Sequence, residues 1–208
     1  MTGSAGRIRF GRILMAVGAL VVACAVALAA RNVWIEGTAG DRAQEVLASL
    51  PAPQVEVDAS LVDPDAAMPA VEVDGAPYIA TLSIPAAGLE LPVGDRATQS
   101  QLAVSPCRYD GSVYADDLVI LGMDYGGHFG LLERIAGGEE VLVEDMLGNT
   151  FVYEAGGPES ARGMSLSRLL EPAGQDEEGA GLVLASCDID GSIGLVVRCR
   201  RVDVSSGS

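Results

Sequence analysis

Short runs of β-branched and aliphatic residues, separated by turn signals, constrain the fold of this chain more than any other feature. The run "YIATLSI" alternates in polarity and is closed by Pro85, and later runs are bounded by turns such as "AGGEE" and "LGN". Only brief helical stretches, "TQSQLAV", "FGLLERI" and "SLSRLLEP", interrupt them. This pattern predicts an all-β domain, a closed or nearly closed β-barrel with a few short helices. The runs cover residues 78–84, 89–93, 118–121, 141–144, 150–154, 182–186 and 195–204.

An uncharged run at residues 13–30 precedes the predicted domain. Its 18 residues are just long enough, at roughly 1.5 Å per residue, to cross a hydrocarbon core of about 30 Å. Arginines at 7, 9 and 12 favour a cytoplasmic N-terminus over residues 1–12. We predict a transmembrane signal anchor at the plasma membrane, with the rest of the chain on the extracellular side. Two alternatives stay open, a cleavage site in "ALAARN" and lipidation at Cys24 in "VVAC".

Residues 31–77 separate the anchor from the barrel predicted for residues 78–208. The stretch "GDRAQEVLASLP" places Val46, Leu47 and Leu50 on one face, which predicts a short juxtamembrane helix that ends before Pro51. The composition then shifts to Pro, Ala, Asp and Val, which is typical of an extended spacer.

The net charge of the chain restricts the classes of ligand that it is expected to bind. The formal net charge is −16, and the chain has thirteen arginines and no lysine, so we find no basic face that could collect phosphates. Nucleic-acid binding is therefore not expected. We also expect no cofactor and no metal, because "DIDGS" at residues 188–192 matches no full calcium loop and is typical of a hairpin turn.

Four segments occur in an order that resembles the sortase family, closest to its class B-like members. They are "YIATLSIPAAGLELPV", "SPCRYDGSVYADDLVILG", "HFGLLERIAGGEEVLVEDMLGNTFVYE" and "LVLASCDIDGSIGLVVRCRRV", and the resemblance covers about residues 78–204. The resemblance implies a membrane-anchored cysteine transpeptidase with a sortase-like β-barrel. Such enzymes cut a surface protein at a sorting signal, hold it as a thioester and pass it to an amine on peptidoglycan or a pilin.

Three residue positions carry that chemistry in the family: a cysteine at a strand end, a histidine at the end of a neighbouring strand, and an arginine on the strand after the cysteine. The cysteine position matches Cys187 in "LASC". The histidine position holds Met123, where the family has Gly-His-Asn and this chain has Gly-Met-Asp. Anchoring the register on "VVRCRRV" places Gly194 at the arginine position, and a slip of one residue places Leu195 there.

Two other residues are candidates to substitute for the missing histidine and arginine. His128 is the only histidine, and it lies five residues past Met123, where class B-like sortases have a histidine in addition to the catalytic one. Arg198 would share a strand face with Gly194 but sit about 13 Å away, at roughly 3.3 Å per residue.

We therefore expect a catalytically degenerate sortase that acts as a binding or scaffold module in surface-protein anchoring or pilus assembly. Its expected partners are sorting-signal peptides of surface proteins or pilins, and an active sortase. The alternative is an active transpeptidase or hydrolase that uses Cys187 with a recruited base such as His128.

The cysteine count leaves a second question. If Cys187 is free, Cys107 and Cys199 are the remaining pair in the outer domain. A disulfide between them and three separately buried thiols are both compatible with the sequence, because proximity cannot be deduced from spacing. The bridge would be excluded by a Cα separation above about 7 Å.

Overall fold

The computed structural model describes residues 4–51, 63–163, 180–188 and 190–202 of the chain. It divides into two compact units, residues 1–36 and 37–208. The domain bounds predicted from the sequence stay predictions. The predicted helix in "SLSRLLEP" lies outside the described residues.

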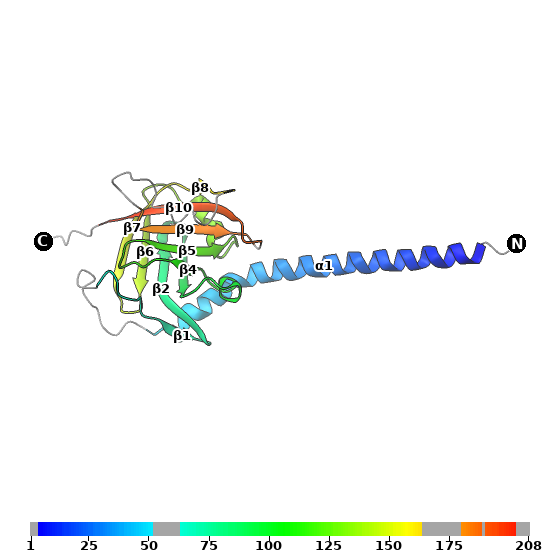
Figure 1. Ribbon diagram of the computed structural model, residues 1–208, viewed down its shortest axis with the longest axis horizontal. Coiled ribbons are helices and arrows are strands. Elements are labelled where there is room, and N and C mark those ends of the chain that lie inside the picture. The colour runs from blue at the N-terminus through cyan, green and yellow to red at the C-terminus, as the bar shows by residue number, and fades with distance from the viewer. Residues whose placement is uncertain (1–3, 52–62, 164–179, 189, 203–208) are drawn as a thin grey trace. The chain divides into compact units, whose positions relative to one another are not determined.

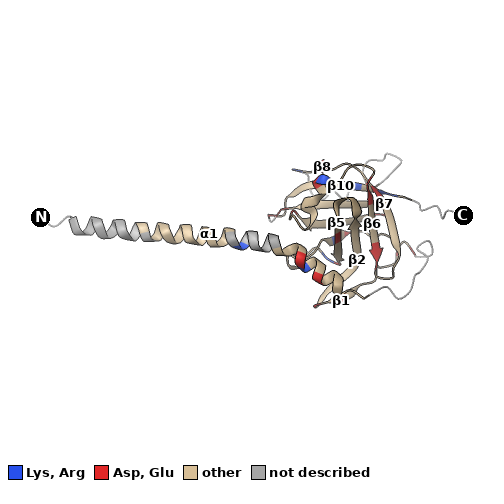
Figure 2. Cartoon of the chain, turned by 180° about the vertical axis from the view of Figure 1, so that it is seen from behind, with Lys and Arg blue, Asp and Glu red and all other residues tan. Residues whose placement is uncertain are grey.

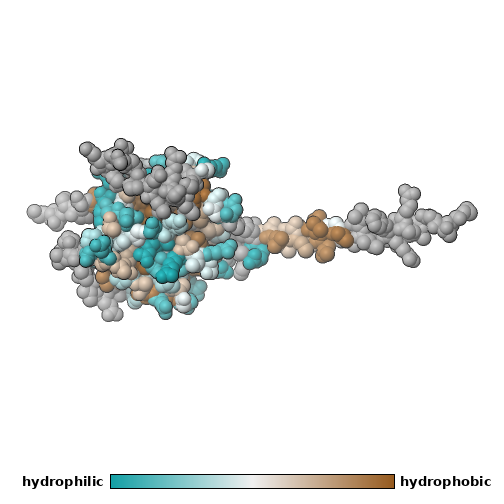
Figure 3. Space-filling model, in the orientation of Figure 1, coloured by the Kyte–Doolittle hydropathy of each residue, from teal (hydrophilic) through white to brown (hydrophobic). Residues whose placement is uncertain are grey.

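The first unit consists of the N-terminal part of helix α1 (Ser4–Ser49). Its described side chains between residues 15 and 29 are exposed and mostly apolar, and they appear in brown shades in Figure 3. Within the part of the chain that the structure describes, no helix is long and apolar enough to cross a membrane. The anchor predicted for residues 13–30 stays a prediction.

The second unit is built around one β-sheet that closes on itself (Figure 1). The order of hydrogen-bonded strands is β1-β2-β3-β4-β5-β9-β10-β7-β6, and β6 pairs back onto β2 through Ala80↔Asp145 to Ser83↔Leu142. The strands from β2 through β6 in this order therefore form a closed barrel, as predicted. The strands are β1 (Val71–Val73), β2 (Ala76–Ile84), β3 (Leu89–Gly94), β4 (Cys107–Asp110), β5 (Leu118–Met123), β6 (Glu140–Asp145), β7 (Thr150–Ala155), β8 (Glu159–Ser160), β9 (Leu182–Cys187) and β10 (Ile193–Arg201).

Short helices connect the strands. They are the 3₁₀ turn η2 (Pro85–Ala87), helix α2 (Gln99–Leu102) and the 3₁₀ helix η3 (Phe129–Arg134). The side chain of Thr98 caps α2 by accepting a hydrogen bond from the backbone N–H of Gln101. The segments "TQSQLAV" and "FGLLERI" were predicted as helical, and both are, although the second is a 3₁₀ helix.

Strands β5 and β9 each bury both faces, which explains why their sequences are nearly continuous apolar runs. They pair in parallel from Leu118↔Leu182 to Met123↔Cys187. One face of the pair belongs to the main barrel core, which includes Leu118 and Leu182. The other face belongs to a second apolar cluster, in which Val119, Val183 and Cys187 pack together. The ends of β5 and β9 therefore lie over a second apolar cluster outside the barrel core.

Residues 37–49 of α1 pack within the second unit. Ala39, Ala43 and Val46 are buried, and Ala43 joins the main core. The sequence predicted a separate helix here, and the structure instead continues α1 through Ser49. Strand β1 lies in the segment predicted as spacer, where Val73 packs with Val46 and Tyr78.

Candidate functional site

The ends of β5 and β9 bring Met123 and Cys187 side by side. The two residues are direct register partners in the parallel pair, so both side chains point to the same face. The Cys187 Sγ lies 3.8 Å from the Met123 Sδ and 3.4 Å from the carbonyl oxygen of Gly122. The sequence analysis placed Cys187 at one strand end and Met123 at the end of a neighbouring strand, and the structure has these two strand ends side by side.

The surroundings of Cys187 keep its thiol protonated. The side chain is buried, with 5% of the residue exposed. Burial, and then the nearby carboxylates of Asp188 and Asp124, raise the pKa of the Cys187 thiol to about 11. At pH 7 only roughly one molecule in ten thousand would carry the thiolate, which is the nucleophilic form.

The residue that faces Cys187 from the other side is Ile193. In the antiparallel pairing of β9 and β10, Ile193 opposes Cys187, and both belong to the second apolar cluster. The register then shifts, so that Leu195 opposes Ser186. The assignment of Gly194 or Leu195 to the arginine position stays a prediction, and the pairing of Ile193 with Cys187 had no local sequence signal because it depends on an irregularity in the ladder.

Gly194 lies within this irregular step. A Cβ at this position would contact only the Ser186 Oγ within 4 Å, at 3.5 Å, and its backbone is not in the left-handed region. A larger side chain could therefore be introduced at residue 194 without steric conflict at its Cβ.

His128 is fully buried immediately before η3. Its Nε2 lies 2.9 Å from the carbonyl oxygen of Val104. Burial lowers the pKa of His128, while the carbonyl groups of Val104 and Ala39 act in the opposite direction. Neither ring nitrogen bonds Cys187 within the described part of the chain, so the geometry assigns His128 a packing contact.

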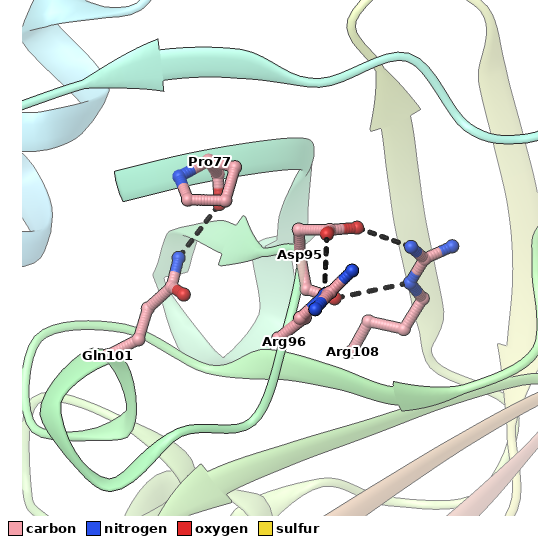
Figure 4. Close-up of polar contacts among 5 residues, drawn as sticks. All are labelled: Pro77, Asp95, Arg96, Gln101 and Arg108. Atoms are coloured by element: carbon pink, nitrogen blue, oxygen red, sulfur yellow. Dashed lines mark hydrogen bonds and ion pairs between the residues drawn. The ribbon is translucent and has the colours of Figure 1, made fainter. Parts of the chain in front are cut away.

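The segment between β3 and β4 borders the second apolar cluster through Ala97 and Leu102. Polar contacts fasten this segment to the barrel, as Figure 4 shows. The Gln101 side chain donates to the Pro77 carbonyl oxygen at 2.8 Å. Asp95 accepts from Arg108, through both its carboxylate and its backbone oxygen, and lies 3.5 Å from the Nε of Arg96.

The turn after Cys187 is held by its own hydrogen bonds. The backbone N–H of Ser192 donates to the Asp190 carboxylate at 2.9 Å, and the N–H of Gly191 donates to the Asp188 carbonyl oxygen at 2.9 Å. This is the hairpin turn predicted for "DIDGS". Among the described residues, no group of three or more His, Cys, Asp or Glu side chains could hold a metal ion.

Cys107 and Cys199 are not bridged in the structure. Both are buried and free, and burial raises the pKa of each thiol to about 12. Cys107 lies on β4 and Cys199 on β10, with β5 and β9 between them. Counted along the curved sheet, three steps of about 4.8 Å separate the two strands, and the straight line across the closed barrel is shorter but still beyond the reach of a disulfide. The bridge considered from the sequence is therefore wrong, because strand order separates the two thiols.

The comparisons with known proteins agree with this architecture. The sortase domain model matches residues 82–202, which is more than half of the chain. The chain therefore belongs to the sortase family. No curated protein sequence matches it.

Among solved structures, the chain is similar to sortase A from Corynebacterium diphtheriae, with a TM-score of 0.52 and 20% sequence identity over 64% of each chain. A lid mutant of the same protein matches with a TM-score of 0.51 and 19% identity, over 83% of this chain and 96% of the other. Streptococcus agalactiae sortase C1 matches with a TM-score of 0.50 and 17% identity, over 62% and 69%. These likenesses support the barrel fold. Because they include sortases of different classes, the class B-like resemblance stays a prediction.

Proposed function

We propose that this sortase-family protein has lost transpeptidation and acts as a binding or scaffold module in the cell envelope. The observation that supports this most is the contact at Cys187. At 3.8 Å from its sulfur lies the thioether of Met123, a group that neither accepts nor donates a proton at neutral pH. The nucleophile position is thus kept, while the neighbour that would activate it is replaced.

Acyl transfer through a cysteine needs a thiolate, a proton donor for the leaving amine, and a donor that stabilises the oxyanion. A positioned general acid typically contributes about 10²–10⁴-fold to rate, and an oxyanion donor about 10²–10³-fold. Met123 and Ile193 supply neither group, and the raised pKa of Cys187 removes most of the thiolate. Even with non-additive effects, little turnover should remain.

Membership of the sortase family supports peptides as the ligands. Sortases are cell-envelope proteins that recognise sorting signals. We propose that this chain binds such peptides of surface proteins or pilins, or associates with an active sortase, without cleaving the peptide.

The test is an activity and binding assay on the full chain with synthetic sorting-signal peptides. We expect calorimetry to detect binding, and intact-mass spectrometry to find no thioester on the wild type. Met123→His combined with Gly194→Arg should restore a trace of acyl-enzyme, because Gly194 has room for a Cβ. The matched controls are Cys187→Ala and His128→Ala.

Wild-type turnover and the absence of peptide binding would each overturn the proposal. Wild-type turnover that disappears in Cys187→Ala would show a working transpeptidase. Turnover that also disappears in His128→Ala would identify recruitment of that histidine. Absence of any peptide binding would contradict the proposed role as a peptide-binding module.

A further inference from the structure

Two sulfur atoms meet at the ends of β5 and β9. The Met123 Sδ lies 3.8 Å from the Cys187 Sγ, and the parallel pairing of the two strands holds these residues side by side. A thioether cannot exchange a proton with the cysteine, but it is a soft metal ligand. A thiolate next to a thioether is a pair of donors that favours soft ions such as Cu(I) over hard ones.

The separation of the two sulfurs suits an ion that both of them bind. Metal–sulfur bonds of about 2.3 Å, the length in zinc thiolates, allow two sulfurs on one ion to lie at most about 4.6 Å apart. The observed 3.8 Å therefore corresponds to a bent arrangement around the ion. Cys187 keeps 5% of its surface exposed and Met123 is only partly buried, so the pair is not sealed from solvent.

The electrostatic surroundings of the pair favour a cation. Strands β5 and β9 contain no charged residue, as the tan colour of β5 in Figure 2 shows. Burial first, and then the carboxylates of Asp188 and Asp124, oppose negative charge on the Cys187 sulfur. A cation that takes the place of the thiol proton balances the thiolate charge and is itself attracted by the two carboxylates.

The composition of the site disfavours the common divalent ions. Structural zinc takes four Cys, His or carboxylate ligands, and calcium takes six to eight oxygens. Within the part of the chain that the structure describes, no group of three or more His, Cys, Asp or Glu side chains could supply them. The second apolar cluster, which packs against Cys187, also limits the water that a hard ion would keep.

We propose that Cys187 and Met123 form a binding site for one Cu(I) ion. Binding breaks the S–H bond of Cys187, releases its proton to water and forms a copper–sulfur bond, while the Met123 thioether donates a lone pair. The copper keeps its oxidation state throughout. The site does not depend on peptide binding, so it goes beyond the function proposed above, and a copper titration can fail while the peptide assay succeeds.

The test is an anaerobic titration of the full chain with Cu(I), with bicinchoninate as the competing chelator. All proteins carry Cys24→Ser, because Cys24 is exposed and would itself bind the ion. We expect the chain to hold one equivalent against the chelator and to lose it in Cys187→Ser. Affinity should fall at least about tenfold in Met123→Leu.

The Met123→Leu exchange nearly preserves side-chain volume, so the fold should be retained. Met68→Leu is the matched control, because Met68 is a buried methionine of the main core, and it should leave the affinity unchanged. Peptide mass spectrometry then locates the ion. One equivalent of Cu(I) should protect Cys187 from iodoacetamide and leave the reaction of Cys107 and Cys199 as it is without copper.

Four results would each overturn the proposal. The chain could fail to hold an equivalent of Cu(I) against bicinchoninate, or Met123→Leu could keep the full affinity, which would show that a thiol alone binds the ion. Protection could fall on Cys107 or Cys199 instead of Cys187. Tighter binding of Zn²⁺ than of Cu(I) would show a site of other composition than two sulfurs.

Discussion

At the scale of single residues, the side chains around Cys187 are unlike those that surround an activated cysteine, whereas the cysteine itself is present. Cys187 lies at its strand end with its sulfur beside a thioether and across from an aliphatic side chain. The one histidine of the chain is occupied elsewhere, with its Nε2 at the Val104 carbonyl group. Neither Met123 nor Ile193 carries a group that can exchange a proton with the Cys187 thiol.

His128 should make the fold sensitive to acid. Its folded pKa lies below the ordinary value of 6.5, so the unfolded chain binds a proton more readily than the folded one as pH falls below 6.5. The contribution of neutral His128 to the free energy of unfolding is therefore fully present above that pH. It is lost on acidification, by at most about 1.4 kcal/mol per pH unit. Thermal unfolding measures this: the loss of stability between pH 7.5 and 5 should be smaller in His128→Gln than in the wild type. An equal loss in both proteins would mean that other groups control acid sensitivity.

Asp145 should be a stability hotspot at the β6–β7 hairpin. Its buried carboxylate accepts hydrogen bonds from the Tyr114 hydroxyl at 2.7 Å, and from the Leu147 N–H and the Asn149 backbone and side-chain N–H groups at 2.8–2.9 Å. Asp145→Ala leaves these donors unsatisfied and should lower the free energy of unfolding by about 3 kcal/mol. Urea unfolding measures this, with the exposed Glu140→Ala as control, expected within about 0.5 kcal/mol of wild type. Equal values for the two variants would contradict the role of Asp145.

At the scale of elements, the last turns of α1 are held by close backbone contact as well as by apolar side chains. A Cβ on Gly127 would come within 2.8 Å of the Gly40 Cα, whereas a Cβ on the adjacent Gly126 would meet nothing within 4 Å. Two glycines therefore permit residues 37–49 to approach the loop between β5 and η3. The same loop carries Asp124 and His128, so this packing also supports the surroundings of the site.

Gly127→Ala should loosen this contact. Because the obstructing atoms are backbone, one element must shift, and the cost should be about 1–3 kcal/mol of unfolding free energy. Limited proteolysis should cut the helix segment near residues 37–49 faster in this variant. Gly126→Ala is the matched control and should behave as the wild type. Similar proteolysis of both variants would show that the glycine contact does not fix the helix.

At the scale of the whole molecule, the sequence predicted the closed barrel because long alternating or apolar runs such as residues 78–84 and 182–186 specify strands by themselves. It missed β1, β4 and β8, which are two to four residues long and have at most one buried residue each. Motif order also placed Cys187 and Met123 together correctly. Ile193 could not be predicted, because its position depends on a local register shift, and the separation of Cys107 and Cys199 depends on strand order.

The most direct test of the central claim is the pH dependence of Cys187 alkylation in the full chain. The rate of modification by iodoacetamide at Cys187, followed by peptide mass spectrometry, should rise with pH towards a midpoint near the pKa of about 11 and stay low at neutral pH. Burial is the largest cause of the raised pKa of Cys187, and the nearby carboxylates of Asp188 and Asp124 are the next. A rate that reaches its plateau at or below pH 7.5 would reveal an activated thiolate and contradict the account of an unactivated cysteine.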